Sequence, residues 1–454
     1  MTTYVAAVER LYALGHELHH GPSRKFDLAH MRLLCGELGD PQLKTPAVLV
    51  AGTNGKGSTA ATLASILKAS GHRTGLYTSP HLLRINERIQ LDGRPIPDEA
   101  FAATYDRVTT AAQELVEGGV LPHLPSFFET LTAMAFDYFA REQAEIAVLE
   151  VGMGGRLDAT NIVEPIVSII TDIDLDHQNY LGDTIAAIAG EKAGILRAAR
   201  LAITLPQHPE ANQVLGERMM ELGAHAVSAT RNLPPLVPGA DAAISFAAGA
   251  TRYPLQVLGQ MVEIASPLVG RHQLRNLALA ITAAEELAGL GYRITAMSIA
   301  QGVRQTAWPG RFQRLAATSS RPEVVLDVAH NPAGAWALRA ALSEQYEGRP
   351  MVLLFAAMAD KAVAQMAQIL WPAMQRVVLT RVSGNPRAAQ VAELAALAAE
   401  LGVPHSEAAT VPEAVSLACQ QAHELGAEAL LVVAGSIYLA GEALPTLAEA
   451  DAKS

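Results

Sequence analysis

The chain has 454 residues, of which 50% are hydrophobic and 17% charged, so its composition predicts a globular protein of two or three domains and excludes a disordered one. Its net charge of −11 disfavours nucleic-acid binding, which needs a basic face. The chain has only two cysteines, Cys35 and Cys419, which lie far apart in sequence and make up neither a disulfide framework nor a zinc pattern, and we expect a cytoplasmic protein. The N-terminus lacks the apolar core of a signal peptide, and the longest apolar stretch, about residues 429–440, is too short to span a membrane, so no membrane association is expected.

Along the first 300 residues, apolar runs typical of buried strands alternate with segments of helical periodicity. Helices are expected up to about residue 45 and at 60–67, 98–117, 127–142, 183–197 and 273–290. Strands are expected at 47–50, 73–78, 146–149, 166–170 and 201–205, with short β-like runs between 225 and 268. The fully apolar strands favour parallel pairing, and the alternation predicts an α/β fold with a doubly wound, mainly parallel sheet and a small β subregion.

A second, smaller Rossmann-like α/β domain is expected after a Pro- and Gly-containing hinge. Its strands are predicted at 324–326, 352–355, 377–379 and 430–433, with a helix at 333–343. We therefore divide the chain into a first domain (1–303), a hinge (304–312) and a second domain (313–454). A ligand shared by two such domains is expected at the carboxyl ends of their strands.

The stretch AGTNGKGST at 51–59 lies between an expected strand and an expected helix, and this arrangement predicts a phosphate-binding loop. Only two residues separate its first Gly from Gly-Lys, where the usual pattern has four. Lys56 is expected to contact the β- and γ-phosphates, and Ser58 or Thr59 to cap the helix or to contact the metal.

Carboxylates follow the next two predicted strands. Glu150 ends one of them and is a natural magnesium ligand in an ATP site, although a surface or capping role is an alternative. Asp172, Asp174 and Asp176 then alternate, but a calcium loop is excluded because its sixth and twelfth positions would be His177 and Asp183. Beside an ATP loop, a metal or phosphate role is favoured for His177.

Other polar residues are ambiguous on sequence grounds. Lys192 near the end of a helical segment is usually a solvated charge. Asn331 before Pro332 predicts a helix start, while Asp327 and His330 are candidates for a cleft between the domains. Spacing alone gives no role to Asn276 or Arg311.

Considered together, the motifs point to one family. The chain resembles folylpolyglutamate synthase and dihydrofolate synthase, the folate branch of the Mur ligase superfamily, from about residue 20 to 445. The resemblance rests on GTNGKGS, YTSPHLLRINERIQLDG, SFFETLTAMAF, LEVGMGGRLDATNIV, LDHQNYLG, GEKAGI, PGRF and LDVAHNP, which follow one another in the order typical of the family.

The resemblance implies roles for individual residues. It implies binding of ATP by the loop residues and by three later ones: Asn54, Gly55, Lys56, Gly57, Ser58, Thr59, Asn276, Arg311 and Asp327. It implies that two magnesium ions are bound, with Ser79, Glu150 and His177 as ligands, and that Lys192 carries a carbamate. It implies pterin binding at Phe26, Asp27, Leu28, Ser126, Phe128, Leu157, Asp158 and Ala159, and catalytic roles for Lys56, His177, Lys192 and His330.

Some positions depart from the family pattern. Asp172 stands where a small or amide residue is usual, and Asp174 where Gly or Ala is usual, so two extra carboxylates are expected near the metals. The segment 356–361 lacks the usual glycine, and Ala362 replaces a common aspartate. The two carboxylates are expected to alter the affinity for magnesium. The changes at 356–362 affect the expected contacts with glutamate or between the domains.

The implied activity is an ATP-dependent ligation of L-glutamate to dihydropteroate or a reduced folate through an acyl phosphate, by a monomer. The pterin positions favour an enzyme that both makes dihydrofolate and extends the glutamate tail. A Mur ligase acting on a UDP-sugar is disfavoured, because such enzymes carry a uridine-binding domain before the loop, which here starts near residue 51. A non-catalytic nucleotide-binding module is disfavoured by the presence of Lys56, Glu150, His177 and Lys192.

Overall fold

A computed structural model describes residues 2–15, 28–234, 244–246 and 249–452. By contacts the chain divides into two compact units. The first comprises Met1–Ile244, Arg252–Ser266 and Gln273–Ala307, and the second comprises Ser245–Thr251, Pro267–His272 and Trp308–Ser454. The hinge at 304–312 stays a prediction.

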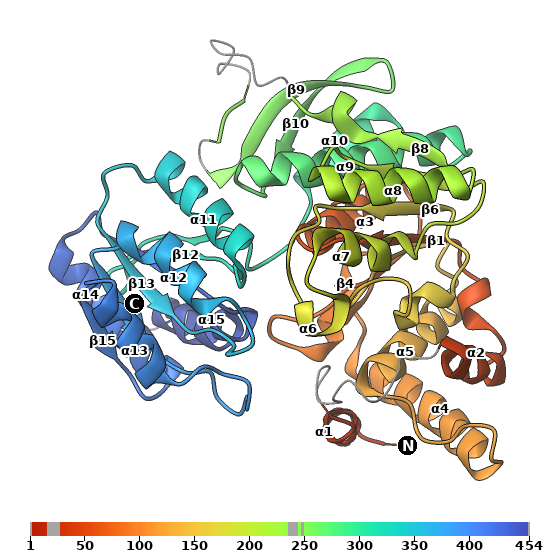
Figure 1. Cartoon of the computed structure of the whole chain (residues 1–454), viewed down its shortest axis with the longest axis horizontal. Coiled ribbons are helices and arrows are strands. Elements are labelled where there is room, and N and C mark those ends of the chain that lie inside the picture. The colour runs from red at the N-terminus through yellow and green to blue at the C-terminus, as the bar shows by residue number, and fades with distance from the viewer. Residues whose placement is uncertain (1, 16–27, 235–243, 247–248, 453–454) are drawn as a thin grey trace. The chain divides into compact units, whose positions relative to one another are not determined.

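The first unit is built on an eight-stranded sheet with the order β4-β3-β2-β5-β1-β6-β7-β8 (Figure 1). The six strands β2, β5, β1, β6, β7 and β8 are parallel, and β3 and β4 form an antiparallel edge. The strands are β1 Ala47–Ala51, β2 Thr74–Tyr77, β3 Ile89–Leu91, β4 Arg94–Pro95, β5 Ile146–Glu150, β6 Val167–Ile170, β7 Leu201–Thr204 and β8 His225–Ser228.

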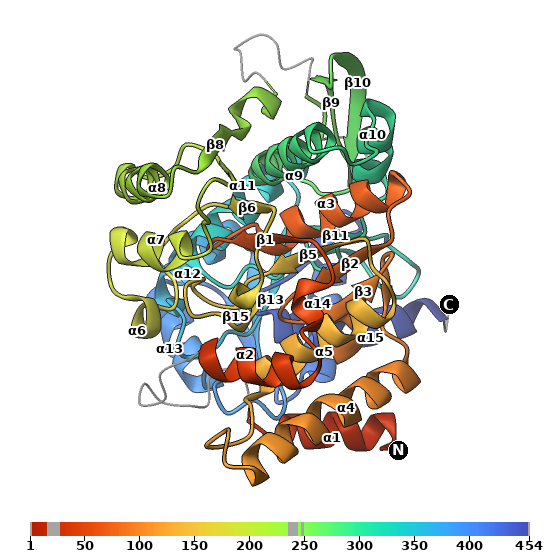
Figure 2. The same ribbon diagram turned by 90° about the vertical axis from the view of Figure 1, so that its right-hand side faces the viewer.

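The central strands are buried on both faces, which explains why their sequences are almost wholly apolar, with only Ser168 in β6 and the terminal Glu150 of β5 as polar residues. In Figure 2, β1 and β5 lie between α3 and α9 on one side and α2 and α5 on the other. Helices of this unit are α1 Tyr4–Ala13, α2 Leu28–Glu37, α3 Lys56–Ala69, α4 Asp98–Glu117, α5 Phe127–Arg141, α6 Gln178–Leu181, α7 Ile185–Ala193, α8 Pro209–Glu221, α9 Arg271–Gly289 and α10 Ala296–Arg304.

The expected small β subregion is present as a two-stranded sheet of β9 (Thr251–Val257) and β10 (Gln260–Ser266). Strand β10 packs against α10, which in turn packs on α3 (Figure 1).

The second unit contains a six-stranded sheet with the order β11-β12-β16-β13-β14-β15, parallel except for β11. Its strands are β11 Gln313–Leu315, β12 Glu323–Leu326, β13 Met351–Phe355, β14 Arg376–Leu379, β15 His405–Glu407 and β16 Leu430–Ala434. Its helices are α11 Pro332–Gln345, α12 Val363–Leu370, α13 Val391–Glu400, α14 Val411–Leu425 and α15 Ile437–Ala452. The predicted α/β fold class is thus confirmed.

Two local predictions have different outcomes. The side chain of Asn331 accepts a hydrogen bond from the Gly334 N–H and caps α11, as expected. The expectation that Ser58 or Thr59 caps its helix is wrong, because α3 already begins at Lys56 and its N-cap is Gly55. The left-handed backbone of Gly55 (φ 87°) starts the helix earlier than a capping hydroxyl would.

The pairing register of the strands places three of their carboxyl ends together. Val50 pairs with Glu150 and Ala51 with Ile170, so the carboxyl ends of β1, β5 and β6 meet at one edge of the sheet. Among the described residues, no helix has both the length and the apolar character needed to cross a bilayer.

The contact between α10 and α3 gives a test of the fold. A Cβ added at Gly302 would lie 2.3 Å from the Cα of Ile66, so Gly302→Ala must push the two helices apart. We expect the free energy of unfolding to fall by about 1–3 kcal/mol in urea titrations. Gly216→Ala in α8, where no described atom lies within 4 Å of the added Cβ, should instead raise it by about 0.5–1 kcal/mol. Equal effects of the two substitutions would contradict this packing.

Candidate active site

The phosphate loop connects β1 to α3 and is hydrogen-bonded to the segment that follows β6. The backbone N–H groups of Thr53 and Asn54 both donate to the carbonyl oxygen of Asp172, at 2.8 and 3.1 Å. The first hydrogen bond of α3 runs from the Thr59 N–H to the Gly55 carbonyl. The N–H groups of Lys56, Gly57 and Ser58 therefore have no partner within the helix, and they form its positive end.

Two glycines of the loop are required by close contacts. A Cβ at Gly52 would lie 1.8 Å from Thr171 Oγ1, and a Cβ at Gly55 would lie 2.1 Å from Asn276 Oδ1. Asn276 comes from α9, more than 200 residues later, and is buried, with its amide donating to Gln273 Oε1 at 2.8 Å. The structure thus brings the predicted nucleotide residue Asn276 onto the loop.

The carbonyl oxygen of Gly52 accepts hydrogen bonds from two lysines. Lys56 Nζ donates to it at 3.1 Å, and also to the carbonyl of Thr53 at 3.2 Å. Lys192 Nζ, from α7, donates to the same oxygen at 2.7 Å. The two predicted lysines therefore meet at the start of the loop, although 136 residues separate them (192 minus 56).

The environment of Lys192 changes its protonation. Its side chain is buried, and burial together with the charge of Lys56 lowers its pKa from 10.5 to about 7, against the opposing effect of Asp176 and Asp158. The solvated charge that its helix position alone indicated is therefore wrong, because α7 packs this residue into the interior. At neutral pH a large fraction of the amine is uncharged and nucleophilic.

Of the predicted metal ligands, Ser79 and Glu150 lie together. The Ser79 N–H donates to Glu150 Oε2 at 3.2 Å, and Glu150 is buried at the end of β5. His177 is the left-handed residue that begins α6, and its Nε2 lies 3.9 Å from Asp176 Oδ2. No three His, Cys, Asp or Glu side chains in the described part of the chain form a group that could hold a metal. Hydroxyl and phosphate oxygens would have to complete a magnesium site here, which suits an ion that is usually bound by one or two carboxylates.

The predicted nucleotide residues of the second unit gather where β12 ends. The carboxylate of Asp327 accepts from the N–H groups of Phe312 and Ala329, both at 2.8 Å, and so fixes the segment that carries Arg311. Arg311 Nη1 donates to the Gly310 carbonyl at 3.3 Å, and His330 Nδ1 lies 2.9 Å from the Val328 carbonyl. The hydrogen bonds of Asp327 thus join the segment that carries Arg311 to the segment that carries His330.

The predicted pterin residues lie on two neighbouring elements. Ser126 caps α5, and Phe128 in its first turn lies against the loop after β5, since a Cβ at Gly152 would be 2.5 Å from Phe128 Cζ. In that loop the buried carboxylate of Asp158 accepts from the N–H groups of Met153 and Thr160, both at 3.0 Å. Asp158 therefore shapes the loop that carries Leu157 and Ala159.

The N-terminal part of the predicted pterin site is only partly described. Leu28 begins α2 and is half-buried against the core. Phe26 and Asp27 lie outside the described residues.

Comparison with known proteins gives the family. The Mur ligase middle domain model matches residues 99–284, and the Mur ligase, glutamate ligase domain model matches 310–437. The chain is 37% identical to folylpolyglutamate synthase of Lacticaseibacillus casei over 79% of its own length and 82% of that protein. It is also 37% identical to dihydrofolate synthase/folylpolyglutamate synthase of Mycobacterium tuberculosis, over 84% and 79% of the two lengths.

The chain belongs to the folylpolyglutamate synthase family. The solved structure of the Mycobacterium tuberculosis folylpolyglutamate synthase complexed with ADP superposes with a TM-score of 0.87 at 34% identity, covering 98% of each chain. An FPGS–AMPPCP–folate complex superposes with a TM-score of 0.78 at 30% identity, covering 98% of this chain and all of that one. The predicted family, fold and ATP-dependent ligase class are confirmed.

Sequence reasoning missed several residues of this family member's site. Thr171 and Gln273 hold the loop and Asn276, and Arg275 binds the Asp172 carboxylate. His81 accepts from Arg88 Nε at 2.8 Å, and burial, aided by Arg88, lowers its pKa to about 3, so it is neutral. His81 stands inside the motif YTSPHLLRINERIQLDG, whereas Thr171, Gln273 and Arg275 carry no signal of their own in the sequence, because each acts through a partner on another element or turn.

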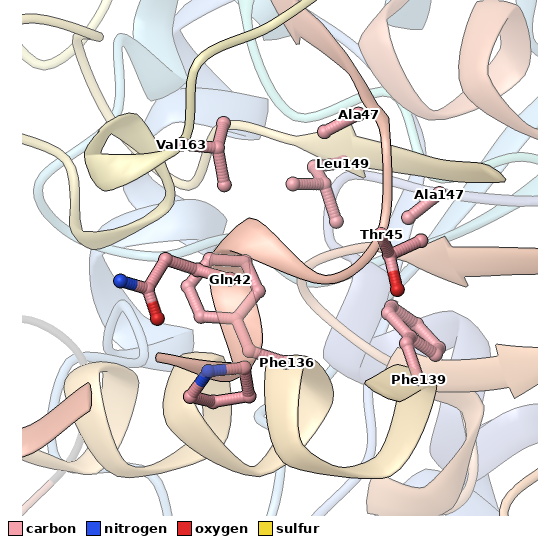
Figure 3. Close-up of a pocket in the computed structure, with 9 residues that line it drawn as sticks. Gln42, Thr45, Ala47, Phe136, Phe139, Ala147, Leu149 and Val163 are labelled. Atoms are coloured by element: carbon pink, nitrogen blue, oxygen red, sulfur yellow. The ribbon is translucent and has the colours of Figure 1, made fainter. Parts of the chain in front are cut away.

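The pocket shown in Figure 3 lies away from this site. Ala47 on its wall is the first residue of β1 and Ala147 the second of β5, so the pocket is near the amino ends of these strands, opposite the phosphate loop. Its lining is mostly apolar and comprises Pro41, Gln42, Thr45, Ala47, Phe136, Phe139, Ala147, Leu149 and Val163.

The lowered pKa of Lys192 predicts a pH-dependent stability. The group is protonated in both states below pH 7, where burying its charge opposes folding fully, and this penalty disappears as pH rises from about 7 to 10.5. Lys192→Met should therefore raise the free energy of unfolding, relative to the unchanged protein, by about 2–3 kcal/mol more at pH 6 than at pH 9.

Urea titrations in CO₂-free buffer at the two pH values measure this difference. Lys68→Met, at an exposed position near the end of α3, should show no such pH dependence. The same increment at both pH values for Lys192→Met would show that the folded-state pKa of this lysine is not lowered.

Proposed function

We propose that the protein joins L-glutamate to the carboxylate of dihydropteroate and of reduced folates, with conversion of ATP to ADP and phosphate through an acyl phosphate. The observation that carries the proposal is the meeting of Lys56 and Lys192 at the Gly52 carbonyl, beside strand β5, which ends in Glu150. A cationic loop next to a buried carboxylate suits the transfer of a phosphoryl group. Relatives named for both activities favour a bifunctional enzyme.

In the proposed reaction, the amides that begin α3 and the ammonium of Lys56 bind the β- and γ-phosphates. Lys56 would leave the carbonyls of Gly52 and Thr53 and turn toward the phosphate oxygens. The substrate carboxylate attacks the γ-phosphorus, and the fixed positive charges stabilise the transition state more than the bound reactants. The amine of glutamate then attacks the acyl phosphate, and phosphate leaves.

Oxygen donors at the strand ends fit magnesium. Glu150 and Ser79, with His177 on the neighbouring segment, would hold the ions. Bound Mg²⁺ would neutralise phosphate charge at this edge of the sheet.

The buried, readily deprotonated amine of Lys192 supports the proposed carbamate. Carbon dioxide adds only to an uncharged amine, and a pKa of about 7 keeps much of this amine uncharged at neutral pH. A carbamate retains one N–H, so the hydrogen bond to the Gly52 carbonyl can persist. The modification would exchange a cation for an anion near the phosphate loop.

The remaining assignments follow the same proposal. Phe128 and the loop of Leu157 to Ala159 would bind the pterin, and Asn276 with Arg311 and Asp327 would bind the nucleotide. We propose a cytoplasmic monomer, in keeping with the two free cysteines, Cys35 and Cys419.

A substrate panel tests the activity. ADP release should require both glutamate and a pterin acid, and mass spectrometry should detect one added glutamate on dihydropteroate and on tetrahydrofolate. Lys56→Ala should lose at least about 100-fold in turnover, because a charge at the transferred phosphate is removed. Lys68→Ala, on the exposed face of the same helix, should keep full activity. ADP release that ignores every pterin, or turnover with UDP-muramoyl substrates instead, would refute the proposal.

The carbamate has its own test. Protein equilibrated with ¹³C-labelled bicarbonate should give one carbamate carbon signal in the NMR spectrum, and Lys192→Met should lack it. Removal of CO₂ should lower turnover, and its return should restore it. A spectrum without that signal in the unchanged protein would exclude the modification under those conditions.

A further inference from the structure

Asp172 is one of the two aspartates that depart from the family pattern, and its main chain supports the phosphate loop. Its carbonyl oxygen accepts from both the Thr53 and the Asn54 N–H groups, and Asn54 and Asp172 form an isolated antiparallel bridge. A movement of Asp172 therefore moves the loop.

The side chain of Asp172 is bound by Arg275 of α9. Arg275 Nε donates to Oδ2 at 2.8 Å and to Oδ1 at 3.0 Å, and Nη2 also donates to Oδ1. This is the two-pronged geometry that makes guanidinium–carboxylate pairs strong and directional. Nη2 donates in addition to the Pro206 carbonyl at 2.9 Å, so the guanidinium is fixed from two sides.

The next residue along α9 is Asn276, which lies against the loop. Its Oδ1 occupies the space that a Cβ at Gly55 would need, and its amide nitrogen donates to Gln273 Oε1. Arg275 thus connects Asp172, whose carbonyl binds the loop, to the turn of α9 that carries Asn276.

We propose that the Arg275–Asp172 ion pair is a positioning pair for nucleotide binding. It fixes α9 to the segment after β6, so that Asn276 and the phosphate loop keep the spacing that a nucleotide requires. The inference rests on the proposed nucleotide role of Asn276 and on no step of the ligation.

The contacts favour this role over two others. A magnesium ligand needs accessible carboxylate oxygens, whereas both oxygens of Asp172 accept from one guanidinium. An ordinary surface pair contributes little to stability, and here the side chains are 30% and 36% exposed. This pair therefore differs from an ordinary surface pair in its two neighbours, Asn276 and the loop, and not in its burial.

The test measures the affinity for ADP by calorimetry in the presence of Mg²⁺, with three variants: Arg275→Met, Asp172→Asn and the double variant. We expect each single change to weaken ADP binding about tenfold, and the double variant to be no weaker than the weaker single one, since coupled residues are non-additive. The KM for glutamate and the Mg²⁺ dependence should change less than about twofold. Arg275→Lys should restore part of the affinity, because the ammonium keeps the positive charge but cannot bind the carboxylate with two parallel hydrogen bonds.

The matched control is Arg231→Gln. Arg231 pairs with Glu285 and Glu286 near the other end of α9, at 3.2 and 3.0 Å, and its loss should leave ADP affinity unchanged. Unaltered ADP affinity in Arg275→Met with a lowered melting temperature would show a merely structural pair and overturn the proposal. Additive losses, or a raised Mg²⁺ requirement confined to Asp172→Asn, would also overturn it. Because ADP binding is measured without pterin, a failed ligation assay does not affect this result.

Discussion

The candidate active site depends on the close packing of the glycine-rich loop between the segment after β6 and helix α9. Gly52 faces Thr171 of the neighbouring strand end, and Gly55 faces Asn276 of α9, at separations that leave no space for a side chain. Gly55 also has a left-handed backbone, and α3 starts directly after it at Lys56. The first amides of α3, those of Lys56, Gly57 and Ser58, have no partner within the helix and follow the loop at the end of β1.

This confinement also governs the charges. Gly52 turns its carbonyl toward α7 and the start of α3, so the amino groups of Lys56 and Lys192 share one acceptor. Burial, and after it the charge of Lys56, lowers the pKa of Lys192, and the carboxylates of Asp176 and Asp158 offset only part of the effect. The same geometry therefore leaves Lys192 with a lowered pKa beside the predicted phosphate loop.

Local patterns predicted much of this arrangement. The apolar runs of β1, β5 and β6 indicated buried parallel strands, and α4 has the predicted bounds, because periodicity and caps act over a few residues. The glycine-rich loop and its lysine were found for the same reason. The expected hydroxyl cap of α3 was wrong, since glycine at position 55 can adopt a backbone conformation that makes such a cap unnecessary.

By itself the sequence determined the order of the central strands, though not the edge strands β3, β4, β11 and β15, the position of the glycine-rich loop and, through its motifs, the family. Only the tertiary structure decided that Lys192 is buried, that Ser79 adjoins Glu150, and that Arg275 binds Asp172 across 103 residues. The physical reason is the distance along the chain over which each effect acts. Backbone preferences and apolar periodicity are written in neighbouring residues, whereas burial, proton affinity and ion pairing arise from side chains that meet only when the sheet and its helices have packed.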